Sequence, residues 1–399
     1  MGRAKEWQLA QYERGYDEVD GAICADCVTD AALKTWVDEN VSETSCRFCG
    51  AEADAPIAAS FDDFVGIVLT GIRFDWNHPD DEGILYISAE GGYQASISDS
   101  WDVLADYEIS DDEAVTDAII DAIGNNGWVE REYYAGDKSQ RLSWGWDAFK
   151  DVVKHRTRYV FLAPEEDNGS AEVPPSRMLA AIGETVVDEL AELNLITEIT
   201  TETNLYRIRV GQELYDTGAT IGTPPEQFAN QSNRMSPAGI PMFYGAFDLT
   251  TARLETVDPE HHAGQTLSIG TFRPLRNLRV LDLADLPDIP SVFEAEGHYR
   301  IHPLRFLHAF AYDIVQPIAR DGREHIEYVP TQIVTEYFRR VFRDGEGNAV
   351  DGIIYSSSRE GGDRAFVLFC ENEQCFAVED GPVFKEQLLE LTAVAHEQV

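Results

Sequence analysis

Four cysteines near the N-terminus restrict how this chain can fold. They form two Cys-x-x-Cys pairs, Cys24-Ala-Asp-Cys27 and Cys46-Arg-Phe-Cys49, separated by eighteen residues. Each pair presents two thiolates from one tight turn, and two such pairs at this spacing are typical of a tetrahedral zinc site. Four protein thiolates leave no coordination position for water, so we expect the zinc to be structural. The alternatives are two disulfides or four buried thiols, and a reducing compartment disfavours the disulfides.

The two remaining cysteines, Cys370 and Cys375, lie near the other end of the sequence. Their Cys-x4-Cys spacing is compatible with half of a second metal site. The sequence around them, Leu-Phe-Cys-Glu-Asn-Glu-Gln-Cys-Phe, is more typical of small hydrophobic residues packed beside a strand, and this is the interpretation we favour.

Acidic residues outnumber basic ones by 72 to 31, which gives a formal net charge of -41. The acids are interleaved with apolar residues and do not form a separate acidic tail. Such a chain repels itself at ordinary ionic strength, whereas molar salt shortens the Debye length to about 3 Å and screens the repulsion. We therefore expect a protein of a salt-loving cell; the alternative is a chain that binds a basic partner. The charge also disfavours a nucleic-acid partner, because phosphate contacts need a basic face.

The sequence shows neither a secretory leader nor a membrane span. The start, Met-Gly-Arg-Ala-Lys-Glu-Trp, is followed by polar residues where a signal peptide would be apolar. No run approaches the 18 apolar residues of a membrane helix. We expect a cytoplasmic protein.

A length of 399 residues with 44% hydrophobic residues predicts two or three domains. We divide the chain into a zinc-binding segment (residues 1–55), a mainly helical middle domain (56–195) and a C-terminal domain of mixed helices and strands (196–399). The expected fold class is therefore multidomain α+β.

Local patterns support this division. A helix is predicted from Ala4 to about Glu18. Capping-box spacings at Ser60/Asp63 and Ser110/Glu113 open two further helices, and the second ends at Gly124. Helical spacing of apolar residues recurs around Trp146 and after Pro174-Pro175.

The spacing of apolar residues changes near residue 200, from a mainly helical pattern to one that includes strands. Residues 204–210, 267–272 and 278–282 alternate like strands, and helices are predicted at about 303–316 and 331–342. Two short strands, 352–355 and 365–369, then flank a loop rich in Ser and Gly.

Three clusters of polar residues lie within this C-terminal region. The first is Tyr206-Arg207, the second runs from Asn233 through Arg234-Met-Ser-Pro-Ala-Gly and Phe243-Tyr244 to Thr251-Ala-Arg-Leu-Glu255, and the third is Tyr355-Ser-Ser-Ser-Arg359. Each has an ordinary explanation as a surface arginine, a Pro/Gly loop or a turn. No nucleophile elbow, P-loop or dinucleotide fingerprint is present.

In this order and spacing, the clusters resemble the RES domain, a family named for its Arg, Glu and Ser. The resemblance covers roughly residues 200–375. The chain departs from the family's pattern at Ser236, where Asn is usual. The N-terminal half resembles the HEPN-associated segment that precedes RES in longer family members.

The resemblance implies an ADP-ribosyltransferase-like fold and a toxin-like enzyme that consumes NAD by cleaving the nicotinamide–ribose bond, by hydrolysis or phosphorolysis. In this sequence, Glu255 would stabilise the oxocarbenium-like transition state and hold the attacking water. Arg207, with Arg234 as a second candidate, would bind the pyrophosphate. Tyr244 would stack on nicotinamide or ribose, and Ser357 would hydrogen-bond one of them.

Two other functions stay open. The chain could transfer ADP-ribose to a macromolecule, or it could be a non-catalytic zinc-containing interaction protein whose RES-like part is degenerate. Family members are often paired with a separately encoded antitoxin, so the resemblance also points to an antitoxin as a candidate partner. Toxin, defence and NAD turnover remain alternative biological roles.

Overall fold

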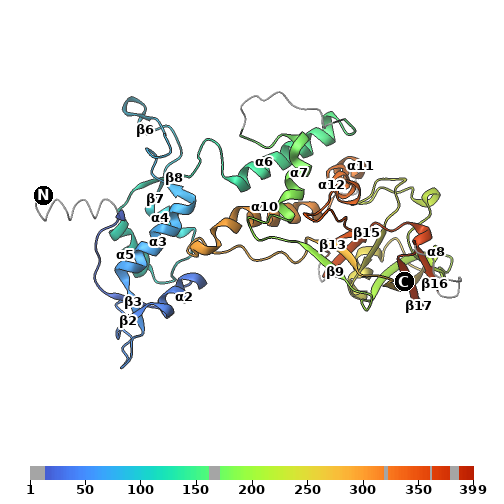
Figure 1. Ribbon diagram of the computed structural model, residues 1–399, viewed down its shortest axis with the longest axis horizontal. Helices are drawn as coiled ribbons and strands as arrows, with labels where there is room; N and C mark the ends of the chain where they lie inside the picture. The colour runs from blue at the N-terminus through green and yellow to red at the C-terminus, as the bar shows by residue number, and fades with distance from the viewer. Residues whose placement is uncertain (1–13, 161–170, 319–321, 360–361, 378–385) are drawn as a thin grey trace, which may run out of the picture. The chain divides into compact units, whose positions relative to one another are not determined.

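A computed structural model describes residues 14–160, 171–318, 322–359, 362–377 and 386–399. The chain divides into two compact units (Figure 1). The first comprises residues 1–138 and 289–302, and the second comprises residues 139–288 and 303–399. The helix expected from Ala4 falls mostly outside the described residues. Within the described residues, every helix is too short or too polar to span a lipid bilayer.

In its described residues, the first unit combines short helices with small antiparallel sheets. Its three-stranded sheet has the order β1-β3-β2, a second sheet has the order β4-β8-β7, and β5 pairs with β6. The elements are β1 (Ala22–Cys24), η1 (Ala25–Cys27), α2 (Ala31–Glu39), β2 (Val41–Glu43), β3 (Ala58–Ser60), α3 (Phe61–Asp75), β4 (Trp76–Asn77), β5 (Tyr86–Ile87), η2 (Ser88–Glu90), β6 (Gly92–Tyr93), β7 (Ser98–Asp99), α4 (Ser100–Ala105), α5 (Glu113–Ile123), β8 (Gly127–Glu130) and η5 (Ala295–Gly297).

Helix α3 begins where the capping pattern places it. The Ser60 hydroxyl accepts a hydrogen bond from the backbone N–H of Asp63 at 3.4 Å. Helix α5 differs from the expectation, because its N-cap is Asp112 and not Ser110. The Ser110 hydroxyl instead donates to the carbonyl of Cys27 at 2.7 Å, which ties the start of α5 to the cysteine segment. The helix ends before Gly124, where φ is +77°.

A large hydrophobic core holds most of the first unit together. Helix α3 buries one face against α5 and against the segment that carries the cysteines, with Ile23, Leu33 and Val37 in the same cluster. Phe293, from the returning segment 289–302, also packs there, and its ring lies 5.6 Å from that of Tyr107.

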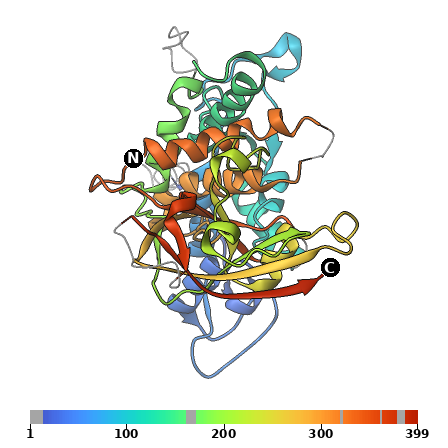
Figure 2. The same ribbon diagram turned by 90° about the vertical axis from the view of Figure 1, so that its right-hand side faces the viewer.

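The second unit is built on a nine-stranded sheet with the order β16-β17-β12-β10-β11-β15-β14-β13-β9. Only the pairs β13–β14 and β16–β17 are parallel. Figure 2 shows the two longest strands, β12 and β17, running side by side. The strands are β9 (Ile196–Ile199), β10 (Leu205–Gly211), β11 (Phe243–Ala246), β12 (Thr266–Pro274), β13 (Leu278–Asp282), β14 (Gly352–Ser356), β15 (Arg364–Leu368), β16 (Cys375–Ala377) and β17 (Leu389–Gln398).

Alternate residues of the central strands enter two different cores, as the two-residue period of a strand requires. Leu281, Ile353 and Val367 pack with the helices, whereas their neighbours Val280, Ile354 and Phe366 pack in a second cluster. The helices and short turns of this unit are α6 (Lys138–Asp151), η3 (Val152–Arg156), α7 (Pro175–Val186), α8 (Gly218–Ile221), η4 (Glu226–Phe228), α9 (Leu249–Thr256), the part of α10 (His298–Val315) from Pro303 onward, α11 (Glu324–Glu327), α12 (Val329–Arg340) and η6 (Asn372–Gln374).

The structure has the mixed helix and strand content of the expected α+β class. The division at residues 55 and 195 remains a prediction about domains. The hydrophobic cores extend across both positions, because the cysteine segment shares a core with α3 and α5, while α6 and α7 share one with β13, β14 and β15.

Candidate functional site

The four N-terminal cysteines converge in the first unit. Cys24 ends β1 and Cys27 lies in η1, whereas Cys46 and Cys49 share a turn that is closed by a hydrogen bond from the Gly50 N–H to the Cys46 carbonyl. Gly50 has φ of +69°, a left-handed conformation that a residue with a side chain adopts only with strain.

The spacing of the sulfurs fits a metal ion better than disulfides. The Sγ atoms of Cys24 and Cys27 are 3.7 Å apart, those of Cys24 and Cys49 are 3.6 Å apart, and those of Cys27 and Cys46 are 3.7 Å apart. A tetrahedron with Zn–S bonds of about 2.3 Å requires edges of about 3.8 Å. A disulfide requires about 2.05 Å. The four residues can therefore hold one tetrahedral ion.

In the second unit, Glu255 and Ser357 are in direct contact. Glu255 lies on α9, which contacts β10, β11 and β15, and Ser357 directly follows β14. The Ser357 hydroxyl donates a hydrogen bond to Oε1 of Glu255 at 2.5 Å. Glu255 is exposed, and its Oε2 takes part in none of the hydrogen bonds that the described residues provide. Ser357 thus fixes one carboxylate oxygen of an exposed side chain.

Tyr244 lies on β11 and contacts both Ser236, through its hydroxyl, and Arg207, through its backbone carbonyl. Its hydroxyl is 2.9 Å from the hydroxyl of Ser236, which is 2% exposed. Burial raises the pKa of Tyr244 to about 12, so the phenol is neutral at ordinary pH. Tyr355, on β14, is also buried; burial raises its pKa, and the negative charge of Glu255 adds to the shift.

Arg207, on β10, is held by backbone carbonyl groups. Its Nε donates to the carbonyls of Ile221 and Gly222 at 2.9 and 3.0 Å, and its Nη1 donates to the carbonyl of Tyr244 at 2.6 Å. The guanidinium also lies over the ring of Phe243, with 5.2 Å between Cζ and the ring centroid. Burial lowers the pKa of Arg207 to about 10, so the side chain is still cationic at neutral pH.

Arg234 is likewise bound to the backbone. Its Nη1 donates to the carbonyls of Ile314 at 3.0 Å and Gln316 at 2.7 Å, at the end of α10. The two arginines that the sequence suggests for the pyrophosphate are therefore both engaged with carbonyl oxygens in the structure. Of their guanidinium nitrogens, Nη2 of each makes none of the hydrogen bonds found among the described residues.

The structure adds polar residues to which the sequence assigned no role. Ser236 and Tyr355 lie within the motifs, and so does Thr251, which is 1% exposed and whose Oγ1 accepts a hydrogen bond from the backbone N–H of Asp363 at 2.9 Å. Their place in the motifs was visible in the sequence, but their burial and partners depend on strands that pair across long distances.

Cys370 and Cys375 lie in the core of the second unit. They are 0% and 4% exposed, with Sγ atoms 3.5 Å apart, and they pack with Leu368 and Leu389. In the described part of the chain, no further potential ligand joins them to make a group of three. Their packing is that of small apolar residues, as their sequence context favours.

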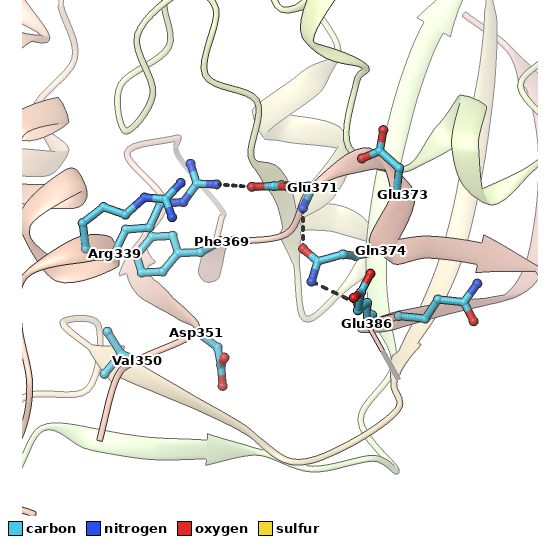
Figure 3. A pocket seen from close by; sticks show the side chains of 10 residues that line it. Arg339, Val350, Asp351, Phe369, Glu371, Glu373, Gln374 and Glu386 are labelled. Atoms are coloured by element: carbon cyan, nitrogen blue, oxygen red, sulfur yellow. Dashed lines mark hydrogen bonds and ion pairs between the residues drawn. The ribbon is translucent and has the colours of Figure 1, made fainter. Parts of the chain in front are cut away.

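A cavity of about 720 Å³ lies elsewhere in the second unit (Figure 3). Figure 3 shows Arg339 reaching Glu371, a pair with 3.3 Å between Nη2 and Oε1, and Gln374 bridging the backbone of Glu371 and Glu386. Neither Glu255 nor Ser357 lines this cavity, and its charges are mixed, so it gives no support to either residue's role.

Comparison with known families agrees with the motifs. A family model described as HEPN/RES N-terminal domain 1 matches residues 39–167, and one described as RES domain matches residues 204–388. The second match contains the Glu255–Ser357 pair, Tyr244 and both arginines. No curated protein and no solved structure matches the chain. This chain therefore combines a HEPN/RES N-terminal domain with a RES domain.

Proposed function

We propose that the RES domain of this chain cleaves NAD between nicotinamide and ribose. A RES domain indicates an NAD-related, toxin-like function in general. The observation that supports the specific reaction is the hydrogen bond of 2.5 Å between Ser357 and Glu255, which orients the carboxylate of an exposed side chain.

The chemistry suits a fixed carboxylate. Loss of nicotinamide gives the ribose an oxocarbenium-like transition state, as in glycoside cleavage. A negative charge held beside this centre stabilises the transition state more than the ground state. Glu255 would supply that charge through Oε2, and the same oxygen would accept a proton from the attacking water or phosphate. Ser357 would keep Oε1 in place, and no nucleophilic role is required of it.

Arg207 would act through its charge more than as a two-pronged clamp. Its Nε and Nη1 are bound to carbonyls, so only Nη2 would be available to a phosphate. The same hydrogen bonds would fix the main chain at Tyr244, whose ring would stack on nicotinamide or ribose. Arg234 would contribute a second positive charge.

The cysteine cluster would hold a structural zinc ion. The sulfur separations of 3.6–3.7 Å support a four-thiolate site with no position left for water or substrate. When bound, the ion would supply folding free energy to the first unit, not chemistry to the second.

The experiment is to mix the protein with NAD in molar KCl and follow nicotinamide release by NMR. We expect wild-type protein to release nicotinamide and Glu255→Ala to release it about 10²–10³ times more slowly, because the variant lacks the charge that stabilises the transition state. Glu202→Ala removes another exposed carboxylate, from a turn of the same unit, and serves as the matched control.

Near-wild-type release by Glu255→Ala would contradict the assignment of that residue. The product identifies the acceptor of the ADP-ribose group. Free ADP-ribose indicates water, and its phosphate ester indicates phosphate. ADP-ribose from labelled NAD that stays on protein or nucleic acid indicates a transferase. Absence of both release and NAD binding would favour the non-catalytic interaction protein. A toxin or defence role, with a separately encoded antitoxin, would require that the wild-type protein releases nicotinamide.

A further inference from the structure

Thr251 connects the two residues of the proposed catalytic pair. It lies on α9 four residues before Glu255, about one helical turn away, so that both side chains project from the same side of the helix. Thr251 is 1% exposed, although its neighbour Thr250 is exposed. A buried hydroxyl needs partners: its Oγ1 accepts a hydrogen bond from the backbone N–H of Asp363 at 2.9 Å, and the side chain of Asp248, the N-cap of α9, is a second hydrogen-bond partner.

Asp363 closes the loop that begins at Ser357. The backbone N–H of Ser357 donates to the carbonyl of Asp363 at 2.8 Å, so these two residues are paired at the base of the loop. Inside it, the N–H of Arg359 donates to the Ser357 hydroxyl at 3.2 Å. The backbone of Asp363 therefore donates its N–H to Thr251, while its carbonyl accepts the N–H of Ser357.

The contacts form a closed ring. From Thr251 the path runs to the N–H of Asp363, through its carbonyl to Ser357, from the Ser357 hydroxyl to Glu255, and back along one turn of α9. The ring fixes the loop after β14 relative to the helix that carries the carboxylate. Thr251 is the residue of α9 that hydrogen-bonds the base of this loop, at Asp363. Its hydroxyl acts on Glu255 and Ser357 only indirectly, through that bond.

We infer that Thr251 is a positioning residue, whose hydroxyl places Ser357 against Glu255 for the reaction. This inference rests on the proposed NAD cleavage for its kinetic consequence, but its structural content is the hydrogen bond between Thr251 and the Asp363 amide. Without the hydroxyl, the Asp363 N–H has no partner in α9 and the base of the loop is free to shift. Ser357 then no longer holds Oε1 of Glu255 in one orientation.

The kinetic test uses three variants: Thr251→Val, which keeps the shape but lacks the hydroxyl; Thr251→Ser, which keeps the hydroxyl; and Thr250→Val, the matched control one residue earlier on the same helix. We expect Thr251→Val to lower kcat for nicotinamide release about tenfold, the effect of losing one ordinary hydrogen bond in the transition state, with KM changed less than about twofold. Thr251→Ser and Thr250→Val are expected to stay within about threefold of wild type. Equal losses in Thr251→Val and Thr251→Ser would contradict the inference, since packing and not the hydroxyl would then matter.

A double-mutant cycle separates positioning from general destabilisation. If Thr251 acts through Ser357, adding Thr251→Val to Ser357→Ala causes no further loss of kcat, because the group that it positions is already gone. If the loss of kcat in the double variant equals the product of the losses in the two single variants, the inference is overturned. The unfolding midpoint of each variant shows whether it is folded at the assay temperature.

Amide exchange gives a reading that is independent of activity. In folded Thr251→Val, the N–H of Asp363 is expected to exchange faster with solvent, whereas amides in β15 keep their wild-type protection. If wild-type protein releases no nicotinamide, the proposed function fails, and exchange at Asp363 still decides the inference. Unchanged exchange at Asp363 in Thr251→Val would overturn it whatever the activity.

Discussion

The hydroxyl of Ser357 is enclosed by groups that fix its direction. It donates to Glu255, it accepts from the N–H of Arg359, and Gly362 lies directly against it. A Cβ built on Gly362 would be 2.5 Å from the Ser357 Oγ and 2.7 Å from its Cβ, far inside van der Waals contact. The absence of a side chain at residue 362 is therefore a requirement of the site.

Gly362→Ala is expected to displace the Ser357 hydroxyl and to slow nicotinamide release at least about tenfold, because the hydrogen bond to Glu255 depends on that position. The measurement is the release rate by NMR at saturating NAD. Gly345→Ala is the matched control, since a Cβ there meets only a side-chain oxygen of Glu189 at 3.5 Å. Undiminished release in Gly362→Ala would show that the loop accommodates a methyl group without moving Ser357.

At the scale of elements, the segments that the sequence predicts best are those with strong local patterns. Helix α3 starts at its capping serine, and β10, β12 and β13 lie within a residue or two of the alternating segments. The helix after Pro174-Pro175 forms as its apolar spacing indicates, and it ends at Val186; Leu190, in the following turn, is 89% exposed.

Among the strands that were not predicted, β11 and β17 are both held by distant partners. β11 has only four residues and pairs with β15 more than a hundred residues later, while β17 pairs with β12 along its whole length. Neither pairing leaves a local pattern in the sequence. The site depends on distant pairing for the same reason. Glu255 and Ser357 were identified from motifs, but their contact, and that of Thr251 with Asp363, depends on β15 pairing with both β11 and β14.

The turn that carries Cys46 and Cys49 allows a direct test of the zinc proposal. We expect the purified protein to contain one zinc ion per chain by mass spectrometry and Cys49→Ser to contain far less. Removing a structural zinc site costs on the order of 10 kcal/mol, which is enough to unfold a unit of ordinary stability. The first unit of Cys49→Ser is therefore expected to lose its cooperative unfolding transition.

Cys375→Ala is the matched control for the zinc measurement. It removes a cysteine from the core of the second unit, where no group of three potential ligands is found among the described residues, so the zinc content should stay at one. Zinc lost equally from both variants, or present in neither them nor the wild type, would contradict a four-cysteine zinc site.

For the whole molecule, the net charge of -41 is the dominant property. The charge is visible on individual elements: Glu113, Asp117 and Asp121 are exposed at four-residue intervals along α5, where like charges repel. Screening by salt removes most of this repulsion.

We expect the unfolding midpoint to rise by about 6–12 °C between 0.1 and 2 M KCl, which corresponds to on the order of 3 kcal/mol of relieved repulsion. The measurement is thermal unfolding by circular dichroism. The double variant Asp117→Asn with Asp121→Asn should be more stable than wild type at 0.1 M and indistinguishable from it at 2 M. A midpoint that does not change with KCl would argue against adaptation to a high-salt interior.

The chain passes from the first unit to the second, returns for residues 289–302, and leaves again. During synthesis on a ribosome, Phe293 emerges only after residues 139–288, so the core around α3 cannot close when the first unit's own N-terminal stretch is complete. Gly71 leaves the space that Phe293 later fills, since a Cβ there would lie 2.3 Å from the Phe293 ring. The hydrophobic core of the first unit therefore stays incomplete during translation until the segment that contains Phe293 has been synthesised.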